Sequence, residues 1–284
     1  MAVAAQPPVN LGSTSTFAIL AGETITNTGS TTVNGSAGGD IGLFPGSDFP
    51  GQAGVTTSGA VHLGDSVASL AKDALVAAYD DAAGRTPVKT IPTELGGTTL
   101  TPGVYNSESG TFEITGTLTL NAKGDPNGVF IFQTRSTLLA TSGSRVSLIK
   151  DARFCRVFWK VGSSATLATG SHFVGHIFAL TDIHAQTGAT VQGQLLARNG
   201  EVTLDTNTIT NGFCATSPTP TPTPTSSRTS TPGGTTPNVP GLPTTGLPPE
   251  EHGLPWQIPA GVFVVSVILL VAAWRLRASS VRQH

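Results

Sequence analysis

The sequence predicts an all-β domain, a solenoid of stacked parallel strands, with one long α-helix packed along its side. Charged residues make up only 11% of the chain, against about 25% in ordinary soluble proteins. The 34 glycines indicate many tight turns. Strand-sized segments and a spacing that repeats along the sequence support the same fold. The net charge of −2, without any run of like charge, does not favour nucleic acid, which binds basic surfaces.

Strand-like segments occur throughout residues 6–215, the range expected for the main domain. They are rich in β-branched and aromatic residues and are bounded by Gly, Asn and Ser. Two-residue Asn-Gly connections, which are typical of β-hairpins, are rare between them. The segments therefore favour stacked coils over a meander of hairpins. Clear examples are Phe17–Leu20, Thr117–Leu120, Val129–Gln133, Arg156–Val161, Val174–Leu180 and Gln194–Ala197.

A repeat is visible toward the end of this domain. The segments Thr166–Thr169, His184–Thr187 and Thr203–Thr206 share the pattern x-apolar-x-Thr and follow one another at a nearly constant spacing. Leu138–Thr141 fits the same pattern before the first of them, at a longer offset that leaves room for an insertion. The spacing between these segments suits one turn of a triangular β-helix. In such a fold, each coil buries its apolar residues against the next coil.

Residues 65–84 break the strand pattern and predict the helix. Asp65 or Ser66 is a suitable N-cap, and Gly84 is a suitable end. The segment is rich in Ala, and its apolar residues recur at helical spacing. The face expected to cover the solenoid consists of Val67, Leu70, Ala71, Ala74, Leu75 and Ala78.

Both ends of the sequence predict an exported protein. Ala2–Ala4 has the small-residue pattern found at the end of signal peptides, so residues 1–5 are interpreted as the remnant of one. Residues 216–241 are rich in Thr and Pro. Because proline removes backbone donors and fixes φ, such a segment is an extended spacer rather than a domain.

A sorting signal is predicted over residues 242–284. Its three parts follow in order: an LPxTG motif, an apolar segment at 258–274, and a tail that contains Arg275, Arg277 and Arg282. This arrangement resembles the sorting signal of bacterial sortase substrates. The motif consists of Leu242, Pro243, Thr244, Thr245 and Gly246.

The resemblance implies that sortase cleaves between Thr245 and Gly246 and joins Thr245 to an amine of the peptidoglycan. The apolar segment would hold the precursor in the membrane transiently, with the basic tail on the cytoplasmic side. A permanent single-span anchor is the alternative. With sortase processing, the main domain is expected to be extracellular and anchored to the cell wall.

Two cysteines, Cys155 and Cys214, lie far apart in the sequence. In an exported protein they could form a disulfide that ties the end of the domain to its middle. Two buried thiols are the alternative, because a sequence does not give the Cα separation that a disulfide needs.

Several segments of the domain resemble the DUF3494 family of ice-binding proteins. The resemblance runs across nearly all of residues 8–214. It implies an irregular, right-handed parallel β-solenoid with a flanking helix, and it implies binding to ice. The segments are AGRTP (83–87), LTPGVY (100–105), GTLTL (116–120), VFIFQ (129–133), VFWKVGSSATL (157–167) and LLARNGEVTLDTNTI (195–209).

The outward rows of the repeat form the expected ice-binding face, which matches the face that the family uses. Thr suits such a face because it presents a hydroxyl and a methyl on a stiff side chain. Side chains alternate along a strand, so inward Leu139, Leu167, Ala185 and Leu204 leave two outward rows. These are Leu138, Thr166, His184 and Thr203, and then Ala140, Ala168, Gln186 and Asp205.

Three further threonines are candidates for the face. Thr24 and Thr26 flank Ile25, which is expected to point inward, and Thr119 lies between two leucines. The bulk and polarity of His184, Gln186 and Asp205 predict modest ice affinity. In the alternative interpretation, the threonines are strand formers on a solvated face, and the protein is a surface adhesin or structural protein that binds a glycan or another protein.

An enzyme is not expected. Asp182, Glu201 and Asp205 are scattered, whereas acid–base catalysis needs clustered carboxylates. The three histidines between residues 172 and 184 do not form a ligand cluster with acidic or thiol residues, so no metal site is predicted. The expected partners are therefore ice, sortase and peptidoglycan, with no cofactor and no nucleic acid.

Overall fold

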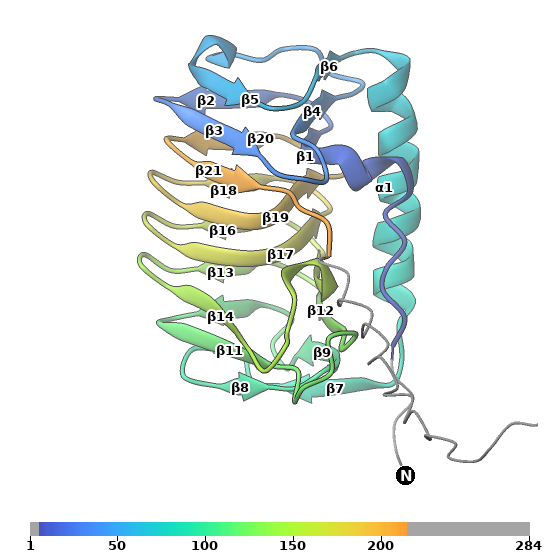
Figure 1. The fold of residues 1–284 in the computed structure, drawn as a ribbon, viewed down its shortest axis with the longest axis vertical. Helices are drawn as coiled ribbons and strands as arrows, with labels where there is room; N and C mark the ends of the chain where they lie inside the picture. The colour runs from blue at the N-terminus through green and yellow to red at the C-terminus, as the bar shows by residue number, and fades with distance from the viewer. Residues whose placement is uncertain (1–5, 215–284) are drawn as a thin grey trace, which may run out of the picture. The chain divides into compact units, whose positions relative to one another are not determined.

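Residues 6–214 of the computed structural model form a stack of parallel β-strands with one α-helix along its side (Figure 1). The structure describes only these residues. The signal-peptide remnant at 1–5, the linker at 216–241, the LPxTG motif at 242–246 and the apolar segment at 258–274 lie outside them. Within 6–214, no helix combines the length and apolar character that crossing a bilayer requires.

The strands form three columns, because the chain passes each of three sides of the stack in turn. The first column contains β7 (Val88–Ile91), β9 (Gly103–Ser107), β12 (Phe130–Thr134), β15 (Val157–Val161), the second halves of β17 (His172–Ala179) and β19 (Thr190–Ala197), β1 (Phe17–Ala21), β4 (Asp40–Leu43) and β6 (Val61–Leu63). All of these neighbours pair in parallel.

The other two columns are built in the same way. The second contains β10 (Phe112–Ile114), β13 (Leu138–Ala140), β16 (Ala165–Leu167), β18 (Ile183–Ala185), β20 (Val202–Asp205) and β2 (Ile25–Thr28). The third contains β8 (Thr99–Leu100), β11 (Thr117–Asn121), β14 (Arg145–Ile149), the first halves of β17 and β19, β21 (Thr208–Thr210), β3 (Thr31–Asn34) and β5 (Val55–Thr57).

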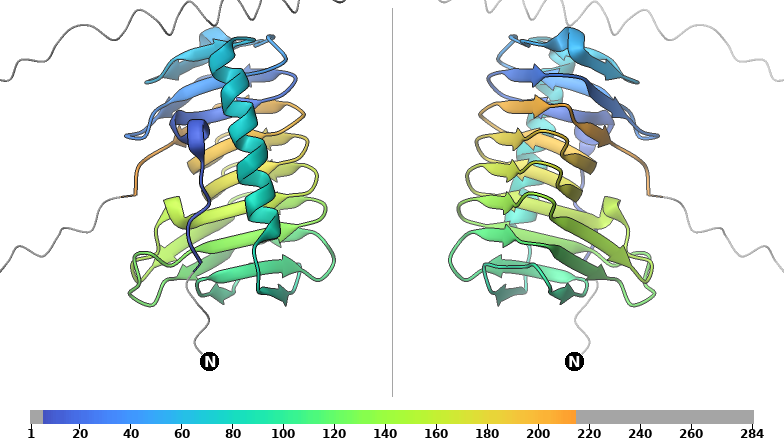
Figure 2. Two further views of the ribbon diagram at one scale, coloured as in Figure 1. Left: turned by 90° about the vertical axis from the view of Figure 1, so that its right-hand side faces the viewer. Right: turned by 90° about the vertical axis from the view of Figure 1, so that its left-hand side faces the viewer.

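The order of coils in space differs from their order in the sequence. The N-terminal strands β1, β2 and β3 lie directly on the C-terminal strands β19, β20 and β21. In Figure 1 the blue strands accordingly rest on the orange ones. Strands β4, β5 and β6 form one end of the stack, here called the β6 end. The helix then leads to the opposite end at β7, the β7 end, from which the chain climbs back (Figure 2).

The helix α1 (Ser66–Gly84) begins after Asp65, whose Oδ1 accepts a hydrogen bond of 2.8 Å from the Ala68 N–H. The prediction of a mostly parallel β-fold with one helix is thus confirmed. The predicted buried face of the helix was partly wrong, because Val67 and Leu70 are 45% and 62% exposed. The helix instead packs with Ala68, Ala71, Lys72, Leu75, Ala78, Tyr79 and Ala82.

An inward row of side chains runs through the first column from end to end. Near the β7 end it is aromatic: the ring centroids of Tyr105 and Phe132 lie 5.6 Å apart, and those of Phe132 and Trp159 lie 3.9 Å apart. The Trp159 Nε1–H donates to the Val174 carbonyl at 3.0 Å, so its polar atom is satisfied in the core. The row continues with buried aliphatic residues through Ile177, Leu195, Ile19 and Ile41.

Two glycines let β17 and β19 turn from the third column into the first. Gly175 and Gly193 have φ values of 114° and 148°, which side chains rarely permit. A Cβ on Gly193 would lie 2.0 Å from the Gly175 carbonyl oxygen. These corners therefore require glycine both for backbone conformation and for space.

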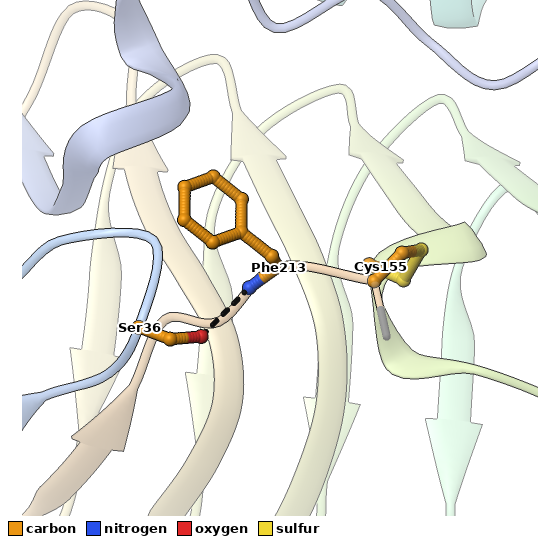
Figure 3. Close-up of a disulfide and its surroundings, with 4 residues drawn as sticks. Ser36, Cys155 and Phe213 are labelled. Atoms are coloured by element: carbon orange, nitrogen blue, oxygen red, sulfur yellow. Dashed lines mark hydrogen bonds between the residues drawn. A yellow bond between two sulfur atoms is a disulfide. The ribbon is translucent and has the colours of Figure 1, made fainter. Parts of the chain in front are cut away.

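A disulfide joins Cys155 to Cys214, with the two Cα atoms 5.5 Å apart. Cys155 lies in the short helix η3 (Phe154–Arg156), just before β15. Directly before Cys214, the Phe213 N–H donates to the Ser36 hydroxyl at 3.2 Å (Figure 3). The end of the domain is thereby attached both to the middle of the chain and to the N-terminal coil.

Candidate functional site

The second column presents one continuous outward row, called the middle row below. The parallel register places its members side by side on successive strands. The residues on either side of each member point into the core. From β10 to β2, the middle row consists of Glu113, Leu139, Thr166, His184, Thr203 and Thr26.

The predicted register was wrong by one residue on β13. Leu139 pairs with Thr166 and is 36% exposed, whereas Leu138 and Ala140 are each 1% exposed. The repeat that precedes Thr166 therefore begins one position later than the sequence pattern indicated. The sequence Leu-Leu-Ala has no polar residue to mark the outward side, and a slip of one residue exchanges the two faces of a strand.

The predicted second row lies at the corner between the second and third columns. Strands β16 and β18 end at Leu167 and Ala185, so Ala168 and Gln186 belong to turns. Ala168 is only 9% exposed, while Gln186 is open to solvent. Asp205 is still in β20 and pairs with Thr28, and its carboxylate accepts a hydrogen bond from the Thr187 hydroxyl.

The edge of the middle row on the side of the first column is acidic. Thr24 lies there, beside Asp48, rather than in the row that contains Thr26. The Asp182 carboxylate accepts hydrogen bonds from the Ser164 hydroxyl at 3.2 Å and from the Glu201 N–H at 3.0 Å. These contacts hold the Asp182 carboxylate at the rim of the face.

His184 connects the middle row to this edge. Its Nδ1 lies 3.0 Å from the Thr203 hydroxyl and 3.9 Å from the Glu201 carboxylate. The imidazole of His184 therefore lies in the centre of the row, next to one carboxylate. From Leu139 to Thr26, the row carries hydroxyl, aliphatic and imidazole groups.

Thr119 does not belong to this face. It lies on β11 in the third column, where it pairs with Thr99 and Ser147. The third column also has a row of threonines that the sequence analysis missed, although the equal spacing of His172, Thr190 and Thr208 was visible. That row consists of Thr117, Arg145, His172, Thr190, Thr208, Thr32 and Thr56.

The surface of the third column is not flat. A hollow of about 440 Å³ lies over β14, β17, β19 and β21, and its lining includes Arg145, Ser147, His172, Gln192 and Thr210. Pairing between β14 and β17 is limited to Arg145 and His172, so the two strands diverge beyond this point. The second column has the more regular pairing, with three or four register partners at every step.

The three histidines between residues 172 and 184 lie in different surroundings. His172 contacts the Thr190 hydroxyl at 2.8 Å on the third column, and His184 belongs to the middle row. His176 is 2% exposed and stacks on Phe158 with 5.2 Å between ring centroids. Burial lowers the pKa of His176 to about 4, against a smaller opposing effect of the Gln194 side chain. Residues 6–214 contain no group of three or more potential metal ligands.

The chain is similar to several proteins that are named ice-binding proteins. One from Nostoc sp. (strain HG1) is 42% identical over 210 residues, which cover 73% of this chain and 76% of that protein. Ice-binding protein 1 of Shewanella frigidimarina (strain NCIMB 400) is 39% identical over 120 residues, which span 42% of this chain but only 14% of that longer protein.

A solved structure and a family model agree with these relatives. The crystal structure of an ice-binding protein from an Antarctic biological consortium has a TM-score of 0.71 at 40% identity, and the match covers 74% of this chain and 94% of that one. The family model described as ice-binding-like matches residues 19–210, which include all three columns and α1. The chain therefore belongs to the ice-binding-like family.

Proposed function

We propose that this chain is an ice-binding protein of the cell surface and that it contacts ice through the middle row of the second column. The main support is that its family and its named relatives are ice-binding proteins. Within residues 6–214, the middle row presents Leu, Thr or His side chains on five successive strands of the second column.

The geometry of the row suits a crystalline ligand. Neighbouring strands in a sheet are about 4.7–4.9 Å apart, so the five residues from Leu139 to Thr26 form a row with a regular spacing. Thr166, Thr203 and Thr26 each add a hydroxyl and a methyl whose χ1 is restricted. Ordering water on such a row costs little side-chain entropy, because threonine side chains have few rotamers to lose.

The same row predicts a modest affinity for ice. Glu113 on β10 continues the row with a charge, and Glu201 and Asp205 lie along its two sides. Charged groups hold their own hydration shells, which do not follow the spacing of ice. The uncharged area is therefore short and narrow.

Attachment to the cell wall is part of the proposal. Its support is the order of the LPxTG motif, the apolar segment at 258–274 and the basic tail in the sequence. Sortase would join Thr245 to peptidoglycan, and the Thr/Pro-rich residues 216–241 would act as a spacer. We also propose that the coils wind as a right-handed solenoid, in agreement with the hand of parallel β crossovers.

Ice-affinity partitioning of residues 6–214 tests the function and the face together. The parent domain is expected to enter growing ice. A Thr166→Tyr/Thr203→Tyr variant is expected to be excluded, because two rings would hold the row away from the crystal. The control variant Thr190→Tyr/Thr32→Tyr places the same rings on the third column, also with one strand between them, and should partition like the parent.

Each other outcome has a definite meaning. If only the third-column variant is excluded, the ice-contacting face lies on the third column. If the folded parent stays in the liquid, ice binding fails, and a surface adhesin that binds a glycan or a protein becomes the better hypothesis.

Wall attachment is tested separately in a Gram-positive host. After muramidase digestion, the full-length chain should be released from the wall fraction with fragments of peptidoglycan bound to it. A Pro243→Ala/Thr245→Ala variant should remain with the membrane fraction. Equal release of both chains would contradict the sortase proposal without affecting the ice-binding one.

A further inference from the structure

The inward row of the first column is apolar along its whole length except for its last member. Each residue lies beside the next on adjacent parallel strands, so the row crosses the entire stack. From the β6 end to the β7 end, it consists of Val61, Ile41, Ile19, Leu195, Ile177, Trp159, Phe132, Tyr105 and Lys89.

Lys89 occupies this last place on the outermost strand, β7. Ile91, two residues later, is 6% exposed and belongs to the core, so Lys89 is on the same inward side of the strand. Lys89 itself is exposed, because no strand of residues 6–214 covers β7. It lies over Tyr105, in a hollow that is also lined by Pro87, Val88 and Pro102.

No strand of residues 6–214 covers the β6 end, and beside the first column its surface is apolar. A hollow at this end is lined by Ile41, Phe49, Val55 and Val61, together with Gln52, Ala53 and Thr57. None of these lining residues has a charge. The inward row of the first column therefore ends at Val61 in a surface that an apolar partner could cover.

The two ends have the same arrangement of segments. Each end is one coil with a strand or bridge segment on each of the three sides: β6, Asp48 and β5 at one end, and β7, Glu94 and β8 at the other. Because all pairs along the stack are parallel, the β7 end of one copy could add to the β6 end of another in the same direction. Such a head-to-tail contact does not close on itself and would lead to filaments.

We propose that the two ends of the stack form a latent interface for a second copy of this chain and that Lys89 keeps this interface from forming. Stacking would place the ammonium of Lys89 over Val61 in the apolar hollow, where the lining offers no carboxylate. A buried charge without a partner is strongly unfavourable. Inward-pointing Lys residues on edge strands are a known protection against edge-to-edge pairing.

Two prolines support this role of the β7 end. Pro87 and Pro92 directly flank β7, and neither has an N–H to donate to an added strand. Glu94 adds a charge to the same end, where its carboxylate accepts hydrogen bonds from the backbone N–H groups of Gly96 and Thr115. The β7 end thus combines the features that limit strand addition.

Sedimentation velocity over a range of concentrations tests the proposal. Residues 6–214 are suitable, because the solved relative that they match consists of little more than this domain. The parent should stay monomeric. Lys89→Leu should form dimers, trimers and longer species whose proportion rises with concentration, and electron microscopy should show filaments.

Two further variants make the result specific. Arg145→Leu also replaces one exposed cation on a strand by leucine, but on the third column, and should remain monomeric. Adding Val61→Lys to Lys89→Leu restores a charge at the opposite end and should return the protein to the monomer. Thermal unfolding of each variant shows that it is folded, and Lys89→Val replaces Lys89→Leu if the latter does not fold.

The proposal is overturned by any of three results. A folded Lys89 variant could remain monomeric at all concentrations. Arg145→Leu could associate as strongly, which would indicate general stickiness of an added leucine. Association of Lys89→Leu could persist with Val61→Lys present, which would show that the β6 end is not the partner.

Discussion

The middle row departs from threonine at two of its uncharged positions, Leu139 and His184. Leucine has no hydroxyl, and its side chain has more rotamers than that of threonine. His184 is the larger disturbance, because its ring is bulky and contacts both Thr203 and Glu201. The quality of the proposed face therefore depends strongly on one residue.

Replacing His184 by threonine should increase ice activity. The new side chain would stand between Thr166 and Thr203, so four successive strands, from β16 to β2, would each present a threonine. Thermal hysteresis at pH 7 is the measurement, and an increase over the parent is expected. His172→Thr, on the third column, is the matched control and should leave the activity unchanged. A lower hysteresis for the His184 variant would argue that the imidazole itself orders water.

Lys72 makes the stability of the domain depend on pH in the alkaline range. It is 8% exposed, and its Nζ donates to the carbonyls of Ala197, at 2.6 Å, and Arg198. Burial, with a further contribution from the positive charge of Arg198, lowers the pKa of Lys72 from 10.5 to about 7. Between these two values the unfolded chain binds the proton and the folded one releases it, so stability rises with pH.

A Lys72→Met variant should lack this rise. Between pH 7 and 9.5 the free energy of unfolding of the parent should increase relative to the variant by on the order of 2–3 kcal/mol. Urea unfolding at the two pH values measures the difference. Parallel curves for parent and variant would mean that Lys72 keeps its proton in the folded domain.

His176 should make the stability of the domain depend on pH in the acid range. Because burial lowers its pKa from 6.5 to about 4, the folded protein holds it neutral while the unfolded chain takes up a proton. Stability should therefore fall as the pH drops from 6.5 to 4, by on the order of 2–3 kcal/mol. In a His176→Phe variant, the loss of stability between pH 6.5 and pH 4 should be smaller by this amount. Thermal unfolding of parent and variant, followed by circular dichroism, measures the difference.

Residue-level prediction from the sequence succeeded where polar and apolar residues alternate. Thr166, His184 and Thr203 were placed together correctly, since each lies between two apolar residues. Leu138 and Leu139 could not be distinguished, because both are apolar and only the neighbouring strand fixes which one faces the core. The pairing of Cys155 with Cys214 was left open for a related reason, since it depends on distance in space.

Among the secondary-structure elements, β17 and β19 show how a single strand can serve two sides of the stack. Each has eight residues and a glycine in its fourth position, at the corner. The pattern of the sequence marked these segments as strands but did not reveal the bend. The signal for it was the glycine in the same place of both repeats.

A Gly193→Ala variant should be strongly destabilised. The backbone conformation alone costs an L-residue about 1–3 kcal/mol, and the new Cβ would also approach the Gly175 carbonyl oxygen to 2.0 Å. Gly188→Ala is the control, because Gly188 has a φ of 70° but open space around it. The melting temperature should fall clearly further for Gly193→Ala. Similar losses for both would show that the corner can relax.

The helix α1 was predictable in position but not in orientation. Its N-cap and its Ala-rich sequence are strong local signals. However, alanines occur on several sides of the helix, so the apolar residues do not define a single face. The packed side is instead selected by contacts with Phe158, Phe178 and Leu196, which the sequence does not place.

Over the whole domain, the sequence predicted stacked coils but not their order. Repeats are regular only in the later coils, and the first coils contain little of the pattern that was aligned. The position of β1, β2 and β3 on top of the last coil depends on a long connection through α1. Sequence spacing alone could not reveal that neighbours in the stack, such as Thr26 and Thr203, come from opposite ends of the domain.

Loss of the disulfide should lower stability substantially. Cys155 and Cys214 are 59 residues apart, and closing a loop of that size stabilises a protein by about 4 kcal/mol in the chain-entropy model. A Cys155→Ser/Cys214→Ser variant should therefore unfold at a lower denaturant concentration. The parent in reducing agent should match it. An unchanged midpoint would show that the unfolded chain is already compact in this region.

The disulfide also determines how the domain would bear mechanical load. A pull on the chain beyond Cys214 reaches Cys155 through the sulfur–sulfur bond and enters the stack at β15, well inside the first column. Residues 156–213 are enclosed in a covalent ring, so a pull at Cys214 is carried to Cys155 as well as to the backbone that leads into β21. Strands β21, β20 and β19 therefore cannot be peeled away one at a time, and the stack must yield as a larger unit. In a cell attached through the C-terminal part of this protein, as proposed above, many strands together would resist a pull on the domain.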